Sequence, residues 1–223
     1  MKKEFFKRFF SSLIIAPITL FFILKGSLFF LFFLFIVFFI TSFEWIKMSK
    51  KSKKMKFFGT IFLFLSFFLA FLLRNSQGFE LFLFIIIISI LTDLGGYIFG
   101  KTFKGPKFTK ISPNKTYSGI IGSFIFSLIG SLIFLEYMPV TLLSIYHDVY
   151  EKYVDYNLFI LFFILIISLI SQIGDLIISY FKRQANIKDT GNILPGHGGL
   201  LDRIDGIIFA VPFSYIILNY GIY

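Results

Sequence analysis

The sequence predicts an all-α integral membrane bundle with about seven transmembrane helices. Hydrophobic residues make up 57% of the 223 residues, Phe alone supplies 36, and charged residues are only 15%, whereas soluble domains contain about 25% charged residues. The mean hydropathy is +0.86. An α-helix needs roughly 20 residues to cross a hydrocarbon core. Seven apolar segments approach or reach that length, at residues 10–24, 27–43, 57–73, 79–99, 118–136, 157–178 and 204–220.

The first two apolar segments are separated only by Lys25 and Gly26, so we expect a tight hairpin between them. A basic stretch, K-K-E-F-F-K-R, precedes the first segment, but no small-residue cleavage pattern follows it. We therefore expect this segment to be retained as a transmembrane helix and not removed as a signal peptide. The chain has no cysteine, which excludes disulfides and thiolate metal sites.

Basic residues are concentrated in alternate loops. Residues 1–9, 44–56, 100–117 and 179–203 carry 19 of the 22 Lys and Arg residues. Cytoplasmic loops of membrane proteins carry such an excess, so the pattern predicts a cytoplasmic N-terminus and an external C-terminus. The formal net charge of +10 is explained by these loops, and we expect no nucleic-acid partner.

Two aspartates, Asp93 and Asp175, lie inside apolar segments near their cytoplasmic ends. An ionised Asp at the centre of a membrane helix costs about 2.5 to 3.5 kcal/mol, so each must face protein, water or a cation. Each could pair with a nearby Lys or Arg and hold the bundle together. Alternatively, without such partners, they could join Asp202 and Asp205, which share one helix face, in an oxygen-ligand set suited to Mg²⁺.

The stretch from Ser179 to Asp205, the polar island, is rich in charge and glycine. Its P-G-H-G-G run at 195–199 cannot form a regular helix and can bring bare backbone N–H groups to an anion. Donors for phosphate oxygens are Lys182, Arg183, Lys188 and Arg203. Carboxylates for a metal beside donors for phosphate indicate a site for a metal-bound nucleotide or polyphosphate.

A second polar segment, residues 100–119, carries five lysines and no acidic residue. It forms another anion-attracting surface on the same side, although topology signalling alone would also explain its lysines. Residues 95–102, G-G-Y-I-F-G-K-T, match the letters of a phosphate-binding loop, but that motif requires a turn between a strand and a helix. Here the letters close a membrane helix, and we expect Gly96 and Gly100 to allow close helix packing instead.

The polar island resembles the signature of the phosphatidate cytidylyltransferases, also called CDP-diacylglycerol synthases. Two further segments, Gly174–Leu176 and Ser112–Thr116, also resemble family motifs, whereas Tyr117 and Ile177 stand where the family often has other residues. The signature is matched at thirteen positions: Ser179, Lys182, Arg183, Lys188, Asp189, Pro195, Gly196, His197, Gly198, Gly199, Asp202, Arg203 and Asp205.

The resemblance implies transfer of CMP from CTP to phosphatidate, giving CDP-diacylglycerol and pyrophosphate in phospholipid biosynthesis. A phosphate oxygen of phosphatidate would attack the α-phosphorus of CTP in line, so no protein nucleophile is needed. The implied cofactor is Mg²⁺, with a second cation as an option. The implied location is the cell inner (plasma) membrane, with the active site on the cytoplasmic side. The sequence leaves open whether the protein forms a homodimer.

The resemblance also implies roles for individual residues. The expected metal ligands are Asp175, Asp202 and Asp205, with Asp93 as a weaker candidate. The expected catalytic residues are Lys188, Asp189, His197 and Arg203. The expected contacts to substrate phosphate come from Lys182, Arg183, Lys115, Ser179, Gly196, Gly198 and Gly199.

We expect one membrane-embedded domain over residues 1–223, in which residues 1–78 form lipid-facing or scaffold helices and residues 79–223 hold the catalytic helices and cytoplasmic loops. Two other functions are compatible with the residues. A CTP-dependent polyprenol or phytol kinase would use similar nucleotide-handling parts but transfer the γ-phosphate. A cation transporter could place Asp93 and Asp175 in its bundle, but it would not need the P-G-H-G-G run.

Overall fold

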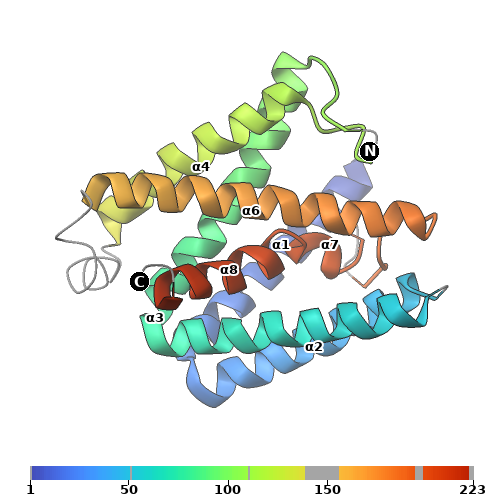
Figure 1. Ribbon diagram of the computed structural model, residues 1–223, viewed down its shortest axis with the longest axis horizontal. Coiled ribbons are helices and arrows are strands. Elements are labelled where there is room, and N and C mark those ends of the chain that lie inside the picture. The colour runs from blue at the N-terminus through green and yellow to red at the C-terminus, as the bar shows by residue number, and fades with distance from the viewer. Residues whose placement is uncertain (1, 51, 110, 139–155, 194–197, 221–223) are drawn as a thin grey trace.

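The computed structural model describes residues 2–50, 52–109, 111–138, 156–193 and 198–220. Within these residues the regular elements are all helices, and no strand is present; isolated bridges occur, such as the one between Lys107 and Thr116. The helices, shown in Figure 1, are α1 (Lys2–Lys25), α2 (Ser27–Met48), α3 (Lys53–Phe103), α4 (Tyr117–Tyr137), α6 (Tyr156–Gln184), α7 (Leu201–Ile204) and α8 (Ile207–Tyr220).

The predicted all-α membrane bundle is confirmed. Four helices, α2, α3, α4 and α6, are long and apolar enough to cross a membrane, and α1 and α8 contain the shorter apolar stretches Leu13–Lys25 and Ile207–Asn219. Each of the seven predicted apolar segments falls within a helix, except that the last one begins with α7 and the turn before α8. The predicted orientation of the termini stays a prediction.

The third and fourth predicted segments share one long helix, α3, which is broken at Gly78. Gly78 has φ 87° and ψ 166°, a conformation that residues with a Cβ rarely adopt. The break lets the two arms of α3 run in different directions, as Figure 1 shows: the first arm lies beside α2 and α8, and the second rises to α4. Both arms therefore contribute to the same bundle through different neighbours.

The expected hairpin between α1 and α2 is confirmed, with Gly26 at φ 63°. Arg74 of α3 fixes it from the side: its Nε donates to the Ile23 carbonyl at 3.1 Å and its Nη2 to the Leu24 carbonyl at 3.2 Å. These carbonyls belong to the last turn of α1, where no intrahelical donor is available. A Cβ at Gly26 would collide with the Arg74 guanidinium.

The second arm of α3 packs closely on α4 through small residues, as expected. A Cβ at Gly96 would lie 2.7 Å from Ser123 Oγ, and one at Gly100 would lie 3.1 Å from Thr116 Oγ1. Side chains of ordinary size would push the two helices apart. Residues 95–102 are helical throughout, so the phosphate-binding-loop letters form no loop.

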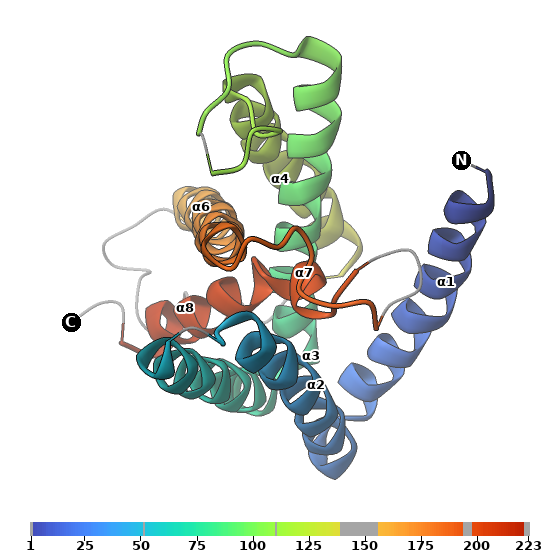
Figure 2. The ribbon, with the colours of Figure 1, turned by 90° about the vertical axis from the view of Figure 1, so that its right-hand side faces the viewer.

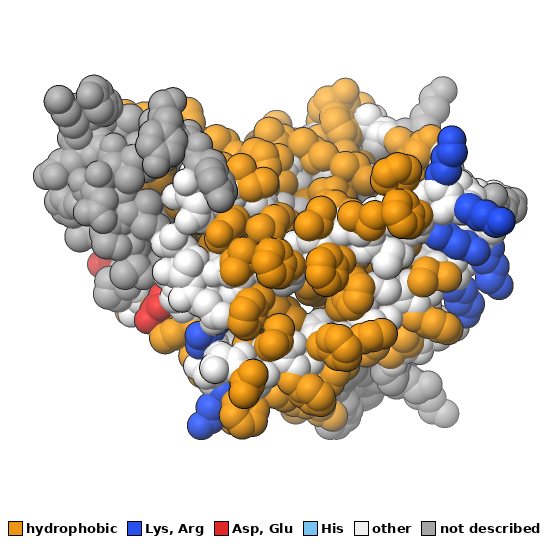
Figure 3. Space-filling view, turned by 60° about the horizontal axis from the view of Figure 1, so that its bottom comes forward, with side chains coloured by type: hydrophobic (Ala, Val, Ile, Leu, Met, Phe, Trp, Pro, Cys, Tyr) orange, Lys and Arg blue, Asp and Glu red, His pale blue; other side chains and the backbone are white. Residues whose placement is uncertain are grey.

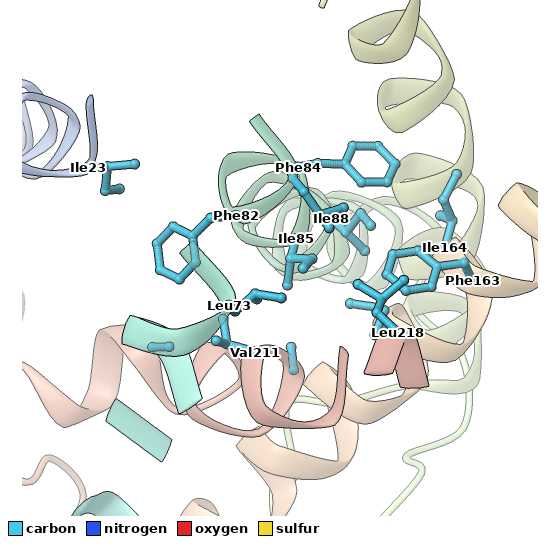
Figure 4. Packing of buried hydrophobic residues seen from close by; sticks show 14 of the residues in the cluster. Ile23, Leu73, Phe82, Phe84, Ile85, Ile88, Phe163, Ile164, Val211 and Leu218 are labelled. Atoms are coloured by element: carbon cyan, nitrogen blue, oxygen red, sulfur yellow. The ribbon is translucent and has the colours of Figure 1, made fainter. Parts of the chain in front are cut away.

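A cluster of buried hydrophobic side chains joins five helices, α1, α2, α3, α6 and α8. Figure 4 shows Ile23 of α1, residues from both arms of α3 such as Leu73 and Phe84, Phe163 of α6 and Val211 of α8 around it. Because α3 supplies side chains from both sides of Gly78, this cluster fixes the angle between its arms. The angle in turn places the far end of α3 beside α4 and α6.

The outer surface is apolar between two more polar ends. Figure 3 shows hydrophobic side chains spread across this face, with most of the visible Lys and Arg side chains at the right-hand end and a few at the lower left. Lipid-facing positions need apolar side chains, and basic residues are tolerated where water or head groups begin. The basic end is therefore the end at which the polar island meets water.

Candidate functional site

The polar island begins in the last turns of α6 and ends at the turn before α8. Residues 185–193 and 198–200 are not helical, as predicted, and α7 follows as a single short turn. Pro195, Gly196 and His197 lie outside the described residues. Figure 2 shows α7 near the centre of the bundle end, between α6 and α2. The island thus folds inward over the helix ends.

A polar cavity of about 270 Å³ lies between the second arm of α3, the 112–116 segment, the start of α4 and α6. We call it the acidic cavity because Asp93 and Asp175 line it together with Lys115. Lys115 Nζ lies 2.7 Å from Asp175 Oδ2 and 3.4 Å from the Gln172 carbonyl oxygen. The Ser179 hydroxyl donates to Asp175 Oδ1 at 3.2 Å.

A second ion-pair cluster lies between the end of α6 and α7. Lys182 Nζ lies 2.9 Å from Asp202 Oδ1 and 4.0 Å from Asp205 Oδ2. Asp205 is only 6% exposed, and its Oδ1 accepts from the Gly206 N–H at 3.0 Å. Its carboxyl group also interacts with those of Asp175 and Asp93. Asp205 therefore links the two clusters into one charged site.

Asp175, Asp202 and Asp205 have cation partners, which is the first of the two alternatives that the sequence left open. Lys115 pairs with Asp175, and Lys182 pairs with Asp202. Both lysines come from segments that the sequence places at the membrane surface, and the fold turns them inward. Among the described residues, no three Asp, Glu or His side chains are grouped as a ready set of metal ligands.

Asp202 also ties the polar island together. Its Oδ2 accepts from the Thr190 N–H at 2.8 Å and the Gly199 N–H at 3.0 Å, and the Thr190 hydroxyl oxygen lies 3.1 Å from it. A Cβ at Gly198 would lie 3.1 Å from the same oxygen. Sequence reasoning assigned Asp202 to a metal, whereas the structure uses one of its two oxygens to close the 190–199 segment.

Glu44 of α2 is part of the site and is absent from the sequence expectations. It is 1% exposed, and its carboxylate accepts from Thr190 and from the backbone N–H groups of Leu200 and Leu201. One signal could have found it, because Glu44 is the single acidic residue in the apolar run 27–48. A carboxylate there must find donors, but the sequence does not say which.

The other expected contacts to phosphate or metal are more dispersed. Arg183 donates from Nε to the Ile111 carbonyl and from Nη1 to the Ile187 carbonyl, both at 3.3 Å, so it joins two loops. Arg203 is exposed on α7 and interacts electrostatically with Asp93. Lys188 and Asp189 are exposed.

A second cavity, of about 700 Å³, lies between the α2–α3 turn and residues 184–192. Asp189, Thr190 and Gly191 line it on one side and Lys47 and Lys50 on the other. Thr190 also contacts Glu44 and Asp202. The 189–191 segment is therefore a shared wall between this cavity and the charged site.

Comparison with known proteins gives matches over the same region. A family model described as "Cytidylyltransferase family" matches residues 55–221. Proteins named phosphatidate cytidylyltransferase are 40% identical in Staphylococcus haemolyticus and 41% in Staphylococcus aureus, each over 155 residues, 68% of this chain and 54% of the relative. One from Rickettsia typhi is 50% identical over 123 residues, 54% of this chain and 50% of the relative. The chain thus spans about half the length of these relatives.

Proposed function

The chain belongs to the cytidylyltransferase family, and from that premise we propose that it transfers CMP from CTP to phosphatidate, giving CDP-diacylglycerol and pyrophosphate. The relatives named for this reaction support the proposal. The observation that carries it is the convergence of Lys115 and Lys182 on Asp175, Asp202 and Asp205 beside the acidic cavity. Negative groups for a cation and positive groups for phosphate then lie within one site.

In the proposed reaction a phosphate oxygen of phosphatidate forms a bond to the α-phosphorus of CTP. The bond between that phosphorus and the oxygen bridging to the β-phosphorus breaks, and pyrophosphate leaves. No side chain of the protein becomes covalently attached, so catalysis depends on positioning and on neutralising phosphate charge. Lys115 and Lys182 are the described residues best placed for the second task.

The lysine–carboxylate pairs suit a site that exchanges partners when substrate binds. Lys115 and Asp175 are about a quarter exposed, so solvent and ligands reach them. When phosphate groups arrive, each lysine can turn from its carboxylate to a phosphate oxygen, because an ammonium on a flexible stem has three rotatable donors. The carboxylates released in this way are then available to a divalent cation.

The donor set fits Mg²⁺, which prefers carboxylate oxygens. Asp175 and Asp205 would hold it, with Asp93 near by. Asp205 Oδ1 accepts one backbone hydrogen bond, from Gly206, whereas Asp202 Oδ2 accepts two, from Thr190 and Gly199. Bound there, Mg²⁺ would offset the charge of the CTP phosphates and withdraw electron density from the α-phosphorus. This ranking places Asp205 above Asp202 among the candidate ligands.

The position of the site suits a reaction between a soluble and a lipid substrate. Tyr97 lines the acidic cavity and is 64% exposed, so the cavity borders the outer surface of α3. We propose that the phosphatidate phosphate reaches the cavity from the membrane, and that CTP enters from the cytoplasm at the basic end of the molecule. The protein would then work in the cell inner membrane.

The test is to incubate the purified protein with phosphatidate, Mg²⁺ and CTP labelled at either the α- or the γ-phosphate. Label from the α-phosphate in the lipid product, with release of pyrophosphate, would support cytidylyl transfer. In a parallel incubation with a polyprenol in place of phosphatidate, label from the γ-phosphate in the lipid would instead identify a kinase. If neither label enters lipid and the protein conducts cations in liposomes without CTP, the proposal is wrong and a transporter is favoured.

A further inference from the structure

We propose that Glu44 is a positioning residue for the charged site, a role that rests on the proposed function. Glu44 lies in α2, outside the region that the family model matches, and 146 to 157 residues before its partners. Its hydrogen bonds among the described residues go to Thr190, Leu200 and Leu201, and not to Lys182, Asp175 or Asp205. Its effect on the reaction therefore passes through the segment that it binds.

Both oxygens of the Glu44 carboxylate accept hydrogen bonds from the polar island. Oε1 accepts from the Leu200 N–H at 2.9 Å, and Oε2 accepts from the Leu201 N–H at 2.8 Å. Oε2 also lies 3.0 Å from the Thr190 hydroxyl. Hydrogen bonds to a charged acceptor are roughly twice as strong as neutral ones. Glu44 therefore holds the backbone of Leu200 and Leu201 in place, and Asp202 is the next residue in the chain.

The island is shaped to fit around this carboxylate. A Cβ at Gly199 would lie 2.7 and 2.8 Å from the two Glu44 oxygens, and a Cβ at Gly191 would lie 2.6 Å from Oε1. Both glycines thus leave the space that Glu44 fills. A fully buried carboxylate is costly unless its donors are all in place, so this part of the island has little freedom to move while Glu44 is present.

A chain of hydrogen bonds runs from Glu44 to the lysine of the site. The Thr190 hydroxyl donates to Glu44 Oε2 at 3.0 Å, and the Thr190 N–H donates to Asp202 Oδ2 at 2.8 Å. The other Asp202 oxygen lies 2.9 Å from Lys182 Nζ. A shift of the Glu44-bound segment would move Asp202, and Asp202 would move Lys182. Displacements of about 1 Å in such groups can cost about 100-fold in rate.

The first test compares Glu44→Gln with Ser42→Ala. Gln is nearly isosteric but offers one acceptor oxygen, so the donors at Oε1 and at Oε2 can no longer both be satisfied. Ser42 is buried on the same helix, and its hydroxyl has no hydrogen-bond partner among the described residues. We expect kcat to fall about 10- to 100-fold in Glu44→Gln, with the KM for CTP changed less than about threefold, and no change in Ser42→Ala.

Hydrogen exchange of the backbone amides gives a readout that does not depend on activity. The Leu200 and Leu201 amides should exchange at least about tenfold faster in Glu44→Gln than in the wild type or Ser42→Ala. Wild-type exchange in Glu44→Gln would overturn the anchoring role. Faster exchange with wild-type kcat, or lower yield with wild-type kcat in the folded fraction, would overturn the positioning role.

A second variant, Thr190→Val, removes the hydroxyl that donates to Glu44 but keeps the hydrogen bonds from the Leu200 and Leu201 N–H groups to Glu44. We expect kcat to fall a few-fold in Thr190→Val. In the double variant Glu44→Gln/Thr190→Val, kcat should fall by less than the product of the two single effects, because both residues belong to the same series of hydrogen bonds. Full additivity would contradict that chain. An inactive wild type would refute the proposed function, and amide exchange alone would then decide whether Glu44 anchors the island.

Discussion

The site contains two carboxylate groups that are satisfied in different ways. Asp175, in the acidic cavity, is held by the side chains of Lys115 and Ser179. Glu44, 1% exposed, is held by two backbone N–H groups and one hydroxyl. A lysine can leave its partner when a metal or a phosphate arrives, but a backbone amide cannot. Asp175 is therefore suited to a role in the reaction, whereas Glu44 is suited to holding the polar island in place.

The largest effect should come from Asp175→Asn, which removes the carboxylate whose lysine partner can be exchanged for a metal ion or a phosphate. Losing a ligand charge next to the reacting phosphates should lower kcat/KM about 1000-fold, while the protein stays folded because Asn keeps the size of the side chain. Radiolabelled CTP incorporation measures this. Glu80→Gln, an acidic change outside the site, serves as the control. Activity within about tenfold of wild type would remove Asp175 from the reaction.

Lys182→Met should have the next largest effect. It removes the ammonium that we assign to phosphate while keeping much of the side-chain volume, and it leaves the carboxylates of Asp202 and Asp205 close together without it. We expect a fall of about 10- to 100-fold in kcat/KM. If Lys182→Arg restores less than half of the activity lost in Lys182→Met, the site needs the compact ammonium group of lysine and not merely a positive charge. Unchanged activity in Lys182→Met would show that Lys182 is only a structural partner of the two aspartates.

Gly199→Ala tests the structural role of Glu44, which depends on close packing of the polar island around its carboxylate. The added methyl group would collide with the Thr190 hydroxyl and approach both Glu44 oxygens, so it should shift the island and lower kcat about tenfold. Overpacking of this kind costs typically 1 to 3 kcal/mol, which thermal unfolding in detergent would detect. Gly130→Ala on α4, where the atoms nearest to the added methyl group belong to the Leu91 side chain, is a control for overpacking away from the site.

Arg74→Ala should have the smallest effect on the reaction. It tests whether a structural contact outside the charged site affects kcat. Arg74 donates to two carbonyls at the end of α1, so its loss should destabilise the hairpin by about 1.5 to 3 kcal/mol and leave kcat unchanged in the folded protein. A drop in kcat larger than that of Gly199→Ala would show that the hairpin is coupled to the site.

The helices and the hairpin could be predicted because their signals are local. Long apolar runs specify helices that cross a membrane, and one Lys–Gly pair between two such runs leaves room only for a tight turn. The polar island was located for the same reason, since its charges contrast with the neighbouring residues. The two arms of α3 were predicted as separate segments, 57–73 and 79–99, and the break between them falls at Gly78.

The partners of the charged groups could not be predicted, because they are set by contacts between distant segments. Lys115 was expected to meet substrate phosphate, and the structure also pairs it with Asp175, 60 residues later. Arg183 was assigned to phosphate, and in the structure it donates to the carbonyl groups of Ile111 and Ile187, which lie in two different loops. Residues 1–78 were assigned to scaffold helices, yet Glu44 from this region reaches the site.

The distance in sequence between Glu44 and its donors has a consequence for synthesis of the protein in the cell. Thr190, Leu200 and Leu201 follow Glu44 by 146 to 157 residues. At about 5 to 20 residues per second, α2 is made roughly 10 to 30 s before those residues exist. During that interval the Glu44 carboxylate needs water, which is available only at the membrane surface. Its place four residues before the end of α2 keeps it there until the polar island arrives.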